Sequence, residues 1–114
     1  MDEPRLLVHW EALLGSLLDH TARFPRSARF TFAARIDQRA LDILECLAAA
    51  RYAPRPQRVA LLTTADRHLA VLRVLLRVAH SRRLLSTGAL GQLTDQLGQA
   101  GQMLGAWRAW LQTP

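Results

Sequence analysis

The chain has 114 residues, half of them apolar, and 15 basic residues outnumber 9 acidic ones. This length suits one domain, residues 1–114, with a modest hydrophobic core. No run reaches the ~18 consecutive apolar residues of a membrane span. The acidic start Met1-Asp2-Glu3-Pro4 also lacks the basic region of a secretory signal. We therefore predict a cytoplasmic protein with no membrane partner.

All 15 basic residues are arginine, and the formal net charge is +6. Genomic base composition accounts for the missing lysines, but a positive excess of this size on a small domain suggests an anionic partner. Guanidinium groups bind phosphates in a bidentate manner. The composition therefore favours nucleic acid as the partner, while a charge that only keeps a scaffold protein in solution is the alternative.

Apolar residues recur at helical spacing in four segments, and no segment shows the alternation of a strand. The first predicted helix covers about residues 6–22 and ends before Pro25, because the residue before a proline avoids the helical region. The second covers about residues 28–51. We expect Ser27 to be its N-cap and Phe30 to be the first residue of its buried stripe.

The third predicted helix, about residues 58–83, is apolar over most of its circumference. Its expected core stripe consists of Leu62, Ala65, Leu69, Leu72, Leu76 and Ala79. Val71, Val74 and Val78 extend the apolar surface well beyond that stripe. A helix that is apolar on most sides is buried on most sides, and in so short a chain other copies of the chain would supply the cover. A wide core stripe inside a monomer is the alternative.

The fourth predicted helix begins after Ser86 or Thr87 as its N-cap. Its apolar positions follow a seven-residue repeat and are Leu90, Leu93, Leu97, Ala100, Leu104, Trp107 and Leu111. Four glycines share a neighbouring stripe, although each costs roughly 1 kcal/mol against alanine. They favour the close approach of another helix backbone. We therefore predict a subunit interface made of Val71, Val74, Val78, Gly98, Gly101, Gly105 and Trp107.

Short connections between the predicted helices make neighbours antiparallel. The predicted fold is all-α, an up-down-up-down antiparallel four-helix bundle that assembles into a ring-like homo-oligomer. In this topology the first and third connections lie at one end of the bundle. The predicted nucleic-acid-binding residues at that end are Arg23, Arg26, Arg29, Arg82 and Arg83, with Arg73 and Arg77 on the adjoining flank.

Neither a catalytic residue nor a metal or cofactor site is predicted. Arg73 and His80 have the spacing of the arginine–histidine pair in HEPN-type helical ribonucleases, but apolar Val74 follows Arg73 and the groups that sharpen that motif are missing. We interpret Arg73 more simply as the partner of Asp66 in an ion pair on one helix face.

Several stretches together resemble Avd, the accessory variability determinant of diversity-generating retroelements. They are residues 24–30, 36–47, 69–79 and 84–86, and the closing Gly101-Gln102-Met103-Leu104-Gly105-Ala106-Trp107. The closing pattern of glycine, methionine, leucine, glycine and tryptophan is the most specific part. Ala106 departs from it, because a second glycine is expected before the tryptophan.

The resemblance implies a basic four-helix bundle that assembles into a pentameric barrel and has no catalytic activity or cofactor. Avd-like proteins bind the retroelement reverse transcriptase and its RNA, with DNA as a further nucleic-acid partner, and support mutagenic copying of a template repeat. The alternative is a nucleic-acid-binding or scaffold role like that of the four-helix protein encoded in ribosomal RNA intervening sequences. A HEPN-like ribonuclease is a further alternative.

Overall fold

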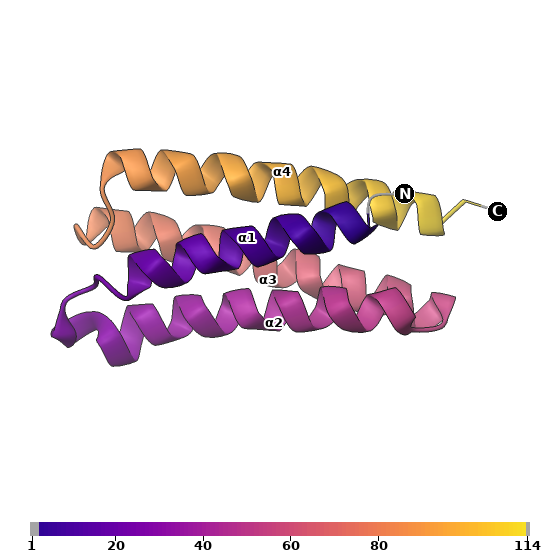
Figure 1. Ribbon diagram of the computed structural model, residues 1–114, viewed down its shortest axis with the longest axis horizontal. Coiled ribbons are helices and arrows are strands. Elements are labelled where there is room, and N and C mark those ends of the chain that lie inside the picture. Colours follow the sequence, from indigo (N-terminus) through magenta and orange to yellow (C-terminus); the bar gives the residue numbers. More distant parts are fainter. Residues whose placement is uncertain (1–2, 114) are drawn as a thin grey trace.

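The computed structural model describes residues 3–113, which form a helical bundle (Figure 1). Its long helices are α1 (Glu3–Thr21), α2 (Ala34–Tyr52), α3 (Arg55–Ser81) and α4 (Thr87–Leu111). A 3-10 turn, η1 (Arg26–Ala28), and a π-helical turn, η2 (Arg29–Ala33), join α1 to α2. No strand occurs in this part of the chain. The all-α prediction is confirmed. Of the acidic start, Met1 and Asp2 lie outside the described residues.

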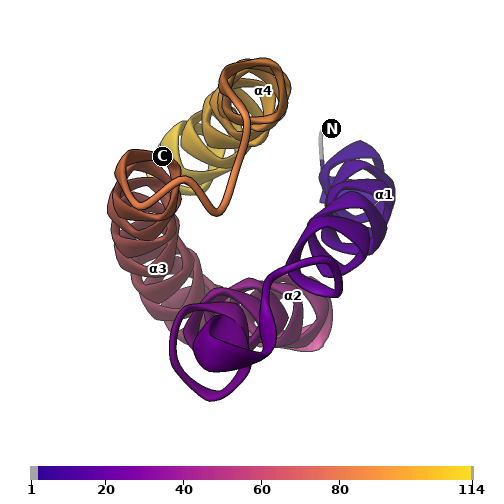
Figure 2. The same ribbon diagram turned by 90° about the vertical axis from the view of Figure 1, so that its left-hand side faces the viewer.

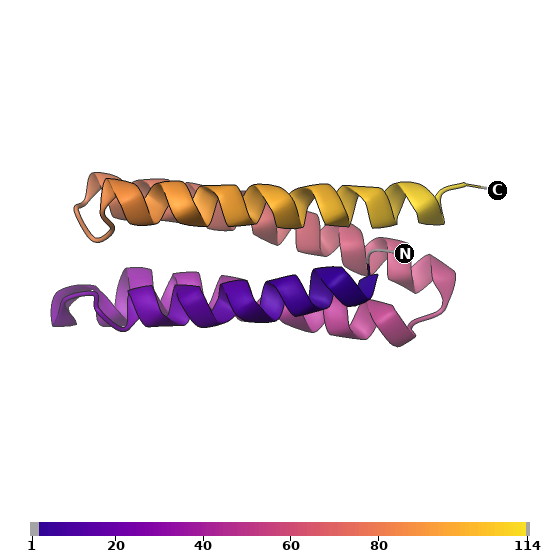
Figure 3. The same cartoon turned by 45° about the horizontal axis from the view of Figure 1, so that its top comes forward.

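The four helices run alternately up and down, as the short connections predict (Figure 1). Viewed along the bundle, each helix packs beside the next in sequence, and α1 closes the arrangement against α4 (Figure 2). The molecule measures 49 × 24 × 20 Å. α3 is inclined to α4 (Figure 3). The antiparallel bundle is therefore confirmed within the subunit, whereas the ring-like assembly stays a prediction.

The core lies where the helical periodicity places it. All six residues of the predicted core stripe of α3 are buried. On α4, Leu90 is half-buried and the other six positions of the seven-residue repeat are buried. Trp10 of α1 is fully enclosed, and its indole Nε1 donates a hydrogen bond to the Ala40 carbonyl of α2 over 3.0 Å. A buried indole usually has such a partner, and this contact joins α1 to α2.

The start of the second helix differs from the prediction. Ser27 is not an N-cap, because the chain enters η1 after Pro25 without a side-chain cap. The π-helical turn follows, in which the Ala34 N–H donates to the Arg29 carbonyl. The turn sets buried Ala28 and Ala33 five residues apart, and Phe30 between them is 85% exposed. The prediction that Phe30 is buried is therefore wrong, because the extra residue in the turn rotates its side chain out of the core.

The start of α4 matches the prediction. Ser86 has extended backbone angles, and its Oγ accepts the backbone N–H of Ala89 over 3.0 Å. This is the usual N-cap contact, which satisfies a backbone donor that the first helical turn leaves unpaired. Across the described residues, no helix combines the length and the apolar character that crossing a membrane requires.

Candidate nucleic-acid interface

Five arginines occupy one end of the bundle, which we call the basic end: Arg23, Arg26, Arg29, Arg82 and Arg83. The α1–α2 and α3–α4 connections both lie there, as the topology predicts (Figure 1). All five side chains are exposed. Within residues 5–113, no carboxylate lies within ion-pair distance of any of the five. The nearby Asp37 carboxylate instead accepts the Thr21 hydroxyl over 2.6 Å.

The basic end has two parts, because its arginines come from two connections. In the view along the bundle the α1–α2 connection lies across the end from the α3–α4 connection (Figure 2). Arg23, Arg26 and Arg29 therefore belong to one side, and Arg82 and Arg83 to the other. Exposed, unpaired guanidinium groups on both sides can each bind a phosphate, and such contacts depend little on base sequence.

Arg83 has a backbone conformation that favours glycine. Its φ is 63°, in the left-handed region. The N–H of Leu84 donates to the Ala79 carbonyl over 2.8 Å, and the N–H of Arg83 donates to the His80 carbonyl over 2.9 Å. These two bonds form a Schellman motif, which usually has glycine at this position. Arginine here costs stability, and such cost is often retained where a side chain is needed for function.

Arg83→Gly should raise the free energy of unfolding by about 0.5–1 kcal/mol, because glycine relieves the left-handed strain but adds freedom to the unfolded chain. Urea unfolding followed by circular dichroism measures the change. Arg82→Gly is the matched control: Arg82 has φ −88° and ψ 6°, so glycine should lower stability there. Equal effects of the two substitutions would contradict the explanation that the left-handed backbone of Arg83 lowers stability.

On the flank, Arg73 is engaged within its own subunit. Its Nη2 donates to the Leu97 carbonyl of α4 over 3.3 Å. The same nitrogen lies 2.8 Å from the place that a Cβ on Gly101 would occupy. Gly101 therefore makes room for an arginine side chain of the same chain, and its place in a subunit interface stays a prediction. Arg77 is exposed and remains available.

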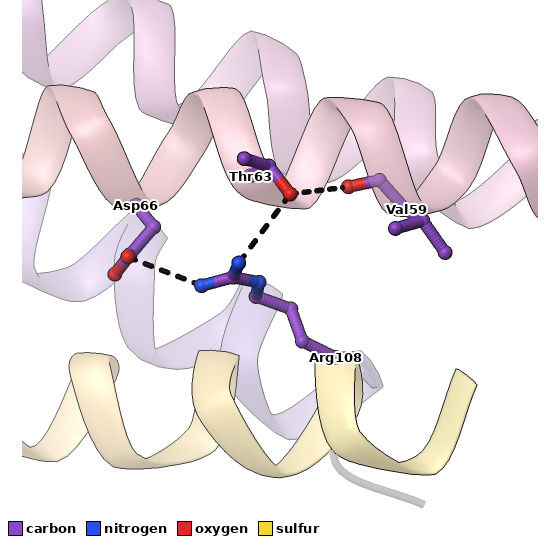
Figure 4. Close-up of polar contacts among 4 residues, drawn as sticks. All are labelled: Val59, Thr63, Asp66 and Arg108. Atoms are coloured by element: carbon purple, nitrogen blue, oxygen red, sulfur yellow. Dashed lines mark hydrogen bonds and ion pairs between the residues drawn. The ribbon is translucent and has the colours of Figure 1, made fainter. Parts of the chain in front are cut away.

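Asp66 pairs with Arg108 of α4, and the predicted pair with Arg73 is wrong (Figure 4). Arg108 Nη1 lies 3.1 Å from Asp66 Oδ2, while its Nη2 donates to the Thr63 hydroxyl over 3.4 Å. That hydroxyl donates to the Val59 carbonyl over 2.9 Å. These contacts join α3 to α4 at the end opposite the basic end. Because Asp66 is half exposed, the pair contributes little to stability.

The arrangement of Arg73 and His80 does not resemble a paired catalytic site. His80 Nε2 lies 3.1 Å from the Thr87 hydroxyl, at the start of α4. Arg73 instead contacts the middle of α4 at Leu97. The two side chains thus have separate partners.

The predicted interface valines lie on the outside of the subunit. Val71, Val74 and Val78 are 40%, 47% and 38% exposed, and we call them the valine strip. The helical wheel of α3 places them on one side, away from the buried core stripe. They are available to another copy of the chain, and their place in an interface stays a prediction.

The other predicted interface residues divide into two groups. A Cβ on Gly98 or Gly105 would meet nothing within 4 Å, so no helix of the same subunit approaches them. Trp107 is only 2% exposed and belongs to the core, which corrects its prediction as an interface residue. The seven-residue repeat that placed it on the core side was the better guide.

The described residues contain no group of three or more histidine, cysteine or acidic side chains able to hold a metal ion. Cys46 is half-buried on α2. Burial raises the pKa of its thiol, and the charges of Asp42 and Glu45 raise it further. The thiol therefore stays protonated at neutral pH and is a poor nucleophile.

Taken together, these features define a basic four-helix-bundle protein with five exposed arginines at one end. The family model described as bAvd-like matches residues 6–111, which include most of α1 and all of α2, α3 and α4. The chain belongs to this bAvd-like family, and the resemblance to Avd is confirmed. A comparison with curated proteins gives no significant match.

Proposed function

We propose that the chain is a non-catalytic accessory protein of a diversity-generating retroelement. In this role it binds the reverse transcriptase and the template RNA or its cDNA, and supports mutagenic copying of the template repeat. The observation that carries the proposal is the bAvd-like match over residues 6–111. Because a fold alone does not imply a function, the proposal also needs a surface suited to nucleic acid.

The basic end is that surface. Its five exposed arginines have no carboxylate partners within the described residues. Binding there would release counterions from the nucleic acid, which makes affinity strongly dependent on salt. Contacts to phosphates carry little sequence information, so selection of the correct RNA falls to the reverse transcriptase.

Self-association is the second part of the proposal. The exposed valine strip supports contact between copies of the chain, and the resemblance to Avd implies a pentamer. A ring would repeat the basic end in every subunit around one axis. Several weak phosphate contacts on one RNA would then add up through avidity, without any new kind of contact.

Reconstitution with the enzyme tests the proposed function. The chain is purified with a reverse transcriptase encoded in the same locus, and cDNA synthesis is measured on RNA that contains the template repeat. We expect the two proteins to co-elute in size-exclusion chromatography and cDNA to form only when both are present. A reverse transcriptase that elutes alone and makes as much cDNA without the chain would contradict the proposal.

A further inference from the structure

A groove with aromatic and basic walls lies between η2, α2 and α3. Its volume is about 440 Å³, within the range of small-molecule sites. Its walls include Phe30, Phe32, Arg35, Arg39, Val71 and Leu75, and we call this groove the Phe30 groove. η2 directly follows η1, so the groove borders the basic end through Arg29. Apolar side chains thus adjoin guanidinium groups in one concave surface.

Phe30 is the most unusual residue of the groove. It is 85% exposed, whereas Phe32 two residues later is half-buried against the core. The π-helical turn that turns Phe30 outward replaces regular helix, and such turns are frequent at functional sites. Exposure of a phenylalanine ring forgoes the free energy that its burial would supply. The exposed ring of Phe30 is instead available to stack on a flat partner.

The charged residues that line the groove, Arg35 and Arg39, are both positive. No acidic residue lines it, and within residues 5–113 no carboxylate lies within ion-pair distance of Arg35 or Arg39. Arg39 Nη1 donates to His68 Nδ1 over 2.8 Å, which holds its guanidinium against α3. Arg35 is exposed and has no such contact. An anionic partner with a flat apolar group matches these walls better than an uncharged apolar segment does.

We propose that the Phe30 groove holds an unpaired base of single-stranded RNA. The base stacks on the Phe30 ring, and Arg35 and Arg39 contact the neighbouring phosphates. Aromatic platforms beside positive charge bind single strands in this way, whereas the bases of a duplex are already stacked on one another. The inference rests on the proposed RNA binding and adds to it a preference for unpaired strands.

Fluorescence anisotropy tests the inference with a labelled oligouridylate and a fully paired RNA duplex of the same length. Phe30→Ala should weaken oligouridylate binding about fivefold or more and leave duplex binding unchanged. The slope of affinity against salt should not change, because no phosphate contact is lost. Phe30→Trp should keep the wild-type affinity, since it supplies a larger stacking surface.

Phe30→Leu is the matched control, because leucine is apolar but has no aromatic face. It should behave like alanine, and wild-type affinity in this variant would overturn the inference. Val71 belongs to both the groove and the valine strip, so the mass of each variant is measured by light scattering. A fall in mass with Phe30→Ala would show that the groove is a subunit contact and would also overturn the inference.

The two proposals fail in different ways. If wild-type protein binds neither RNA, both the RNA binding in the proposed function and the inference about the Phe30 groove are wrong. If wild-type protein binds oligouridylate and Phe30→Ala binds it equally well, only the inference is wrong. Because Phe30 is outside the core, the substitutions should leave the helical circular dichroism spectrum unchanged.

Discussion

Val74→Glu is expected to convert an assembled form of the protein into monomers. Val74 is 47% exposed in the subunit, so the change leaves the core intact. In an interface, however, covering the exposed 38–47% of each valine of the strip contributes roughly 0.6–1.4 kcal/mol. A carboxylate at the same place would be buried without a partner, which costs more than the valine gains. Multi-angle light scattering after size-exclusion chromatography measures the mass.

Val8→Glu is the matched control for this experiment. Val8 lies on α1 and is 66% exposed, so it receives the same change of charge on another helix. Its mass should equal that of the wild type. A wild-type protein that is already monomeric at micromolar concentration would contradict the prediction. Gly105→Leu offers a second probe, whereas Gly101→Leu does not, because its side chain would collide with Arg73 in the same subunit.

Arg82→Glu combined with Arg83→Glu is expected to lower affinity for RNA by at least about 100-fold. Each lost hydrogen bond between charged groups is worth roughly 1.5–3 kcal/mol, and the introduced carboxylates repel phosphate as well. Both side chains are exposed, so helical content and mass should not change. Fluorescence anisotropy with a labelled RNA at constant salt measures the affinity.

The control for this pair carries the same change of charge elsewhere. Arg51 and Arg67 are exposed, and both lie outside the basic end. Arg51→Glu combined with Arg67→Glu should weaken binding much less, since only the long-range attraction changes. Equal losses in the two double variants would mean that net charge, and not the basic end, determines RNA binding.

The helices and the core were predictable because their signal is local and repeated. The seven-residue repeat on α4 and the core stripe on α3 each place one side chain every helical turn on the same side. Phe30 fits that period equally well, so the sequence predicted its burial. The π-helical turn that exposes it depends on how the α1–α2 connection closes. The only sign of this turn in the sequence is the five-residue spacing between Ala28 and Ala33, which are both buried.

Contacts between distant segments were harder to predict. Asp66 is seven residues from Arg73 and 42 from Arg108, and helical periodicity predicts only the near pair. The packing of α3 against α4 instead brings Asp66 into an ion pair with Arg108. The glycine stripe is ambiguous for the same reason, because the missing side chain at Gly101 can make room for an arginine as well as for a helix backbone.

The candidate site was predictable to the extent that topology determines it. Short connections place Arg23, Arg26 and Arg29 at the same end as Arg82 and Arg83, and exposure follows from their position in connections. The left-handed backbone of Arg83 was not predictable, since arginine carries no preference for it. It results from the way α3 ends against the core through Leu84.

The salt dependence of RNA binding shows directly whether the basic end contacts phosphates. Affinity for a single-stranded RNA is measured by anisotropy over a series of salt concentrations, for the wild type and for the Arg82→Glu, Arg83→Glu variant. Each phosphate contact contributes ~0.7 to the slope of log affinity against log salt. We expect a steep wild-type slope that falls by about 1.4 in the variant when both arginines bind phosphate. Identical slopes in the two proteins would contradict a basic end that binds nucleic acid.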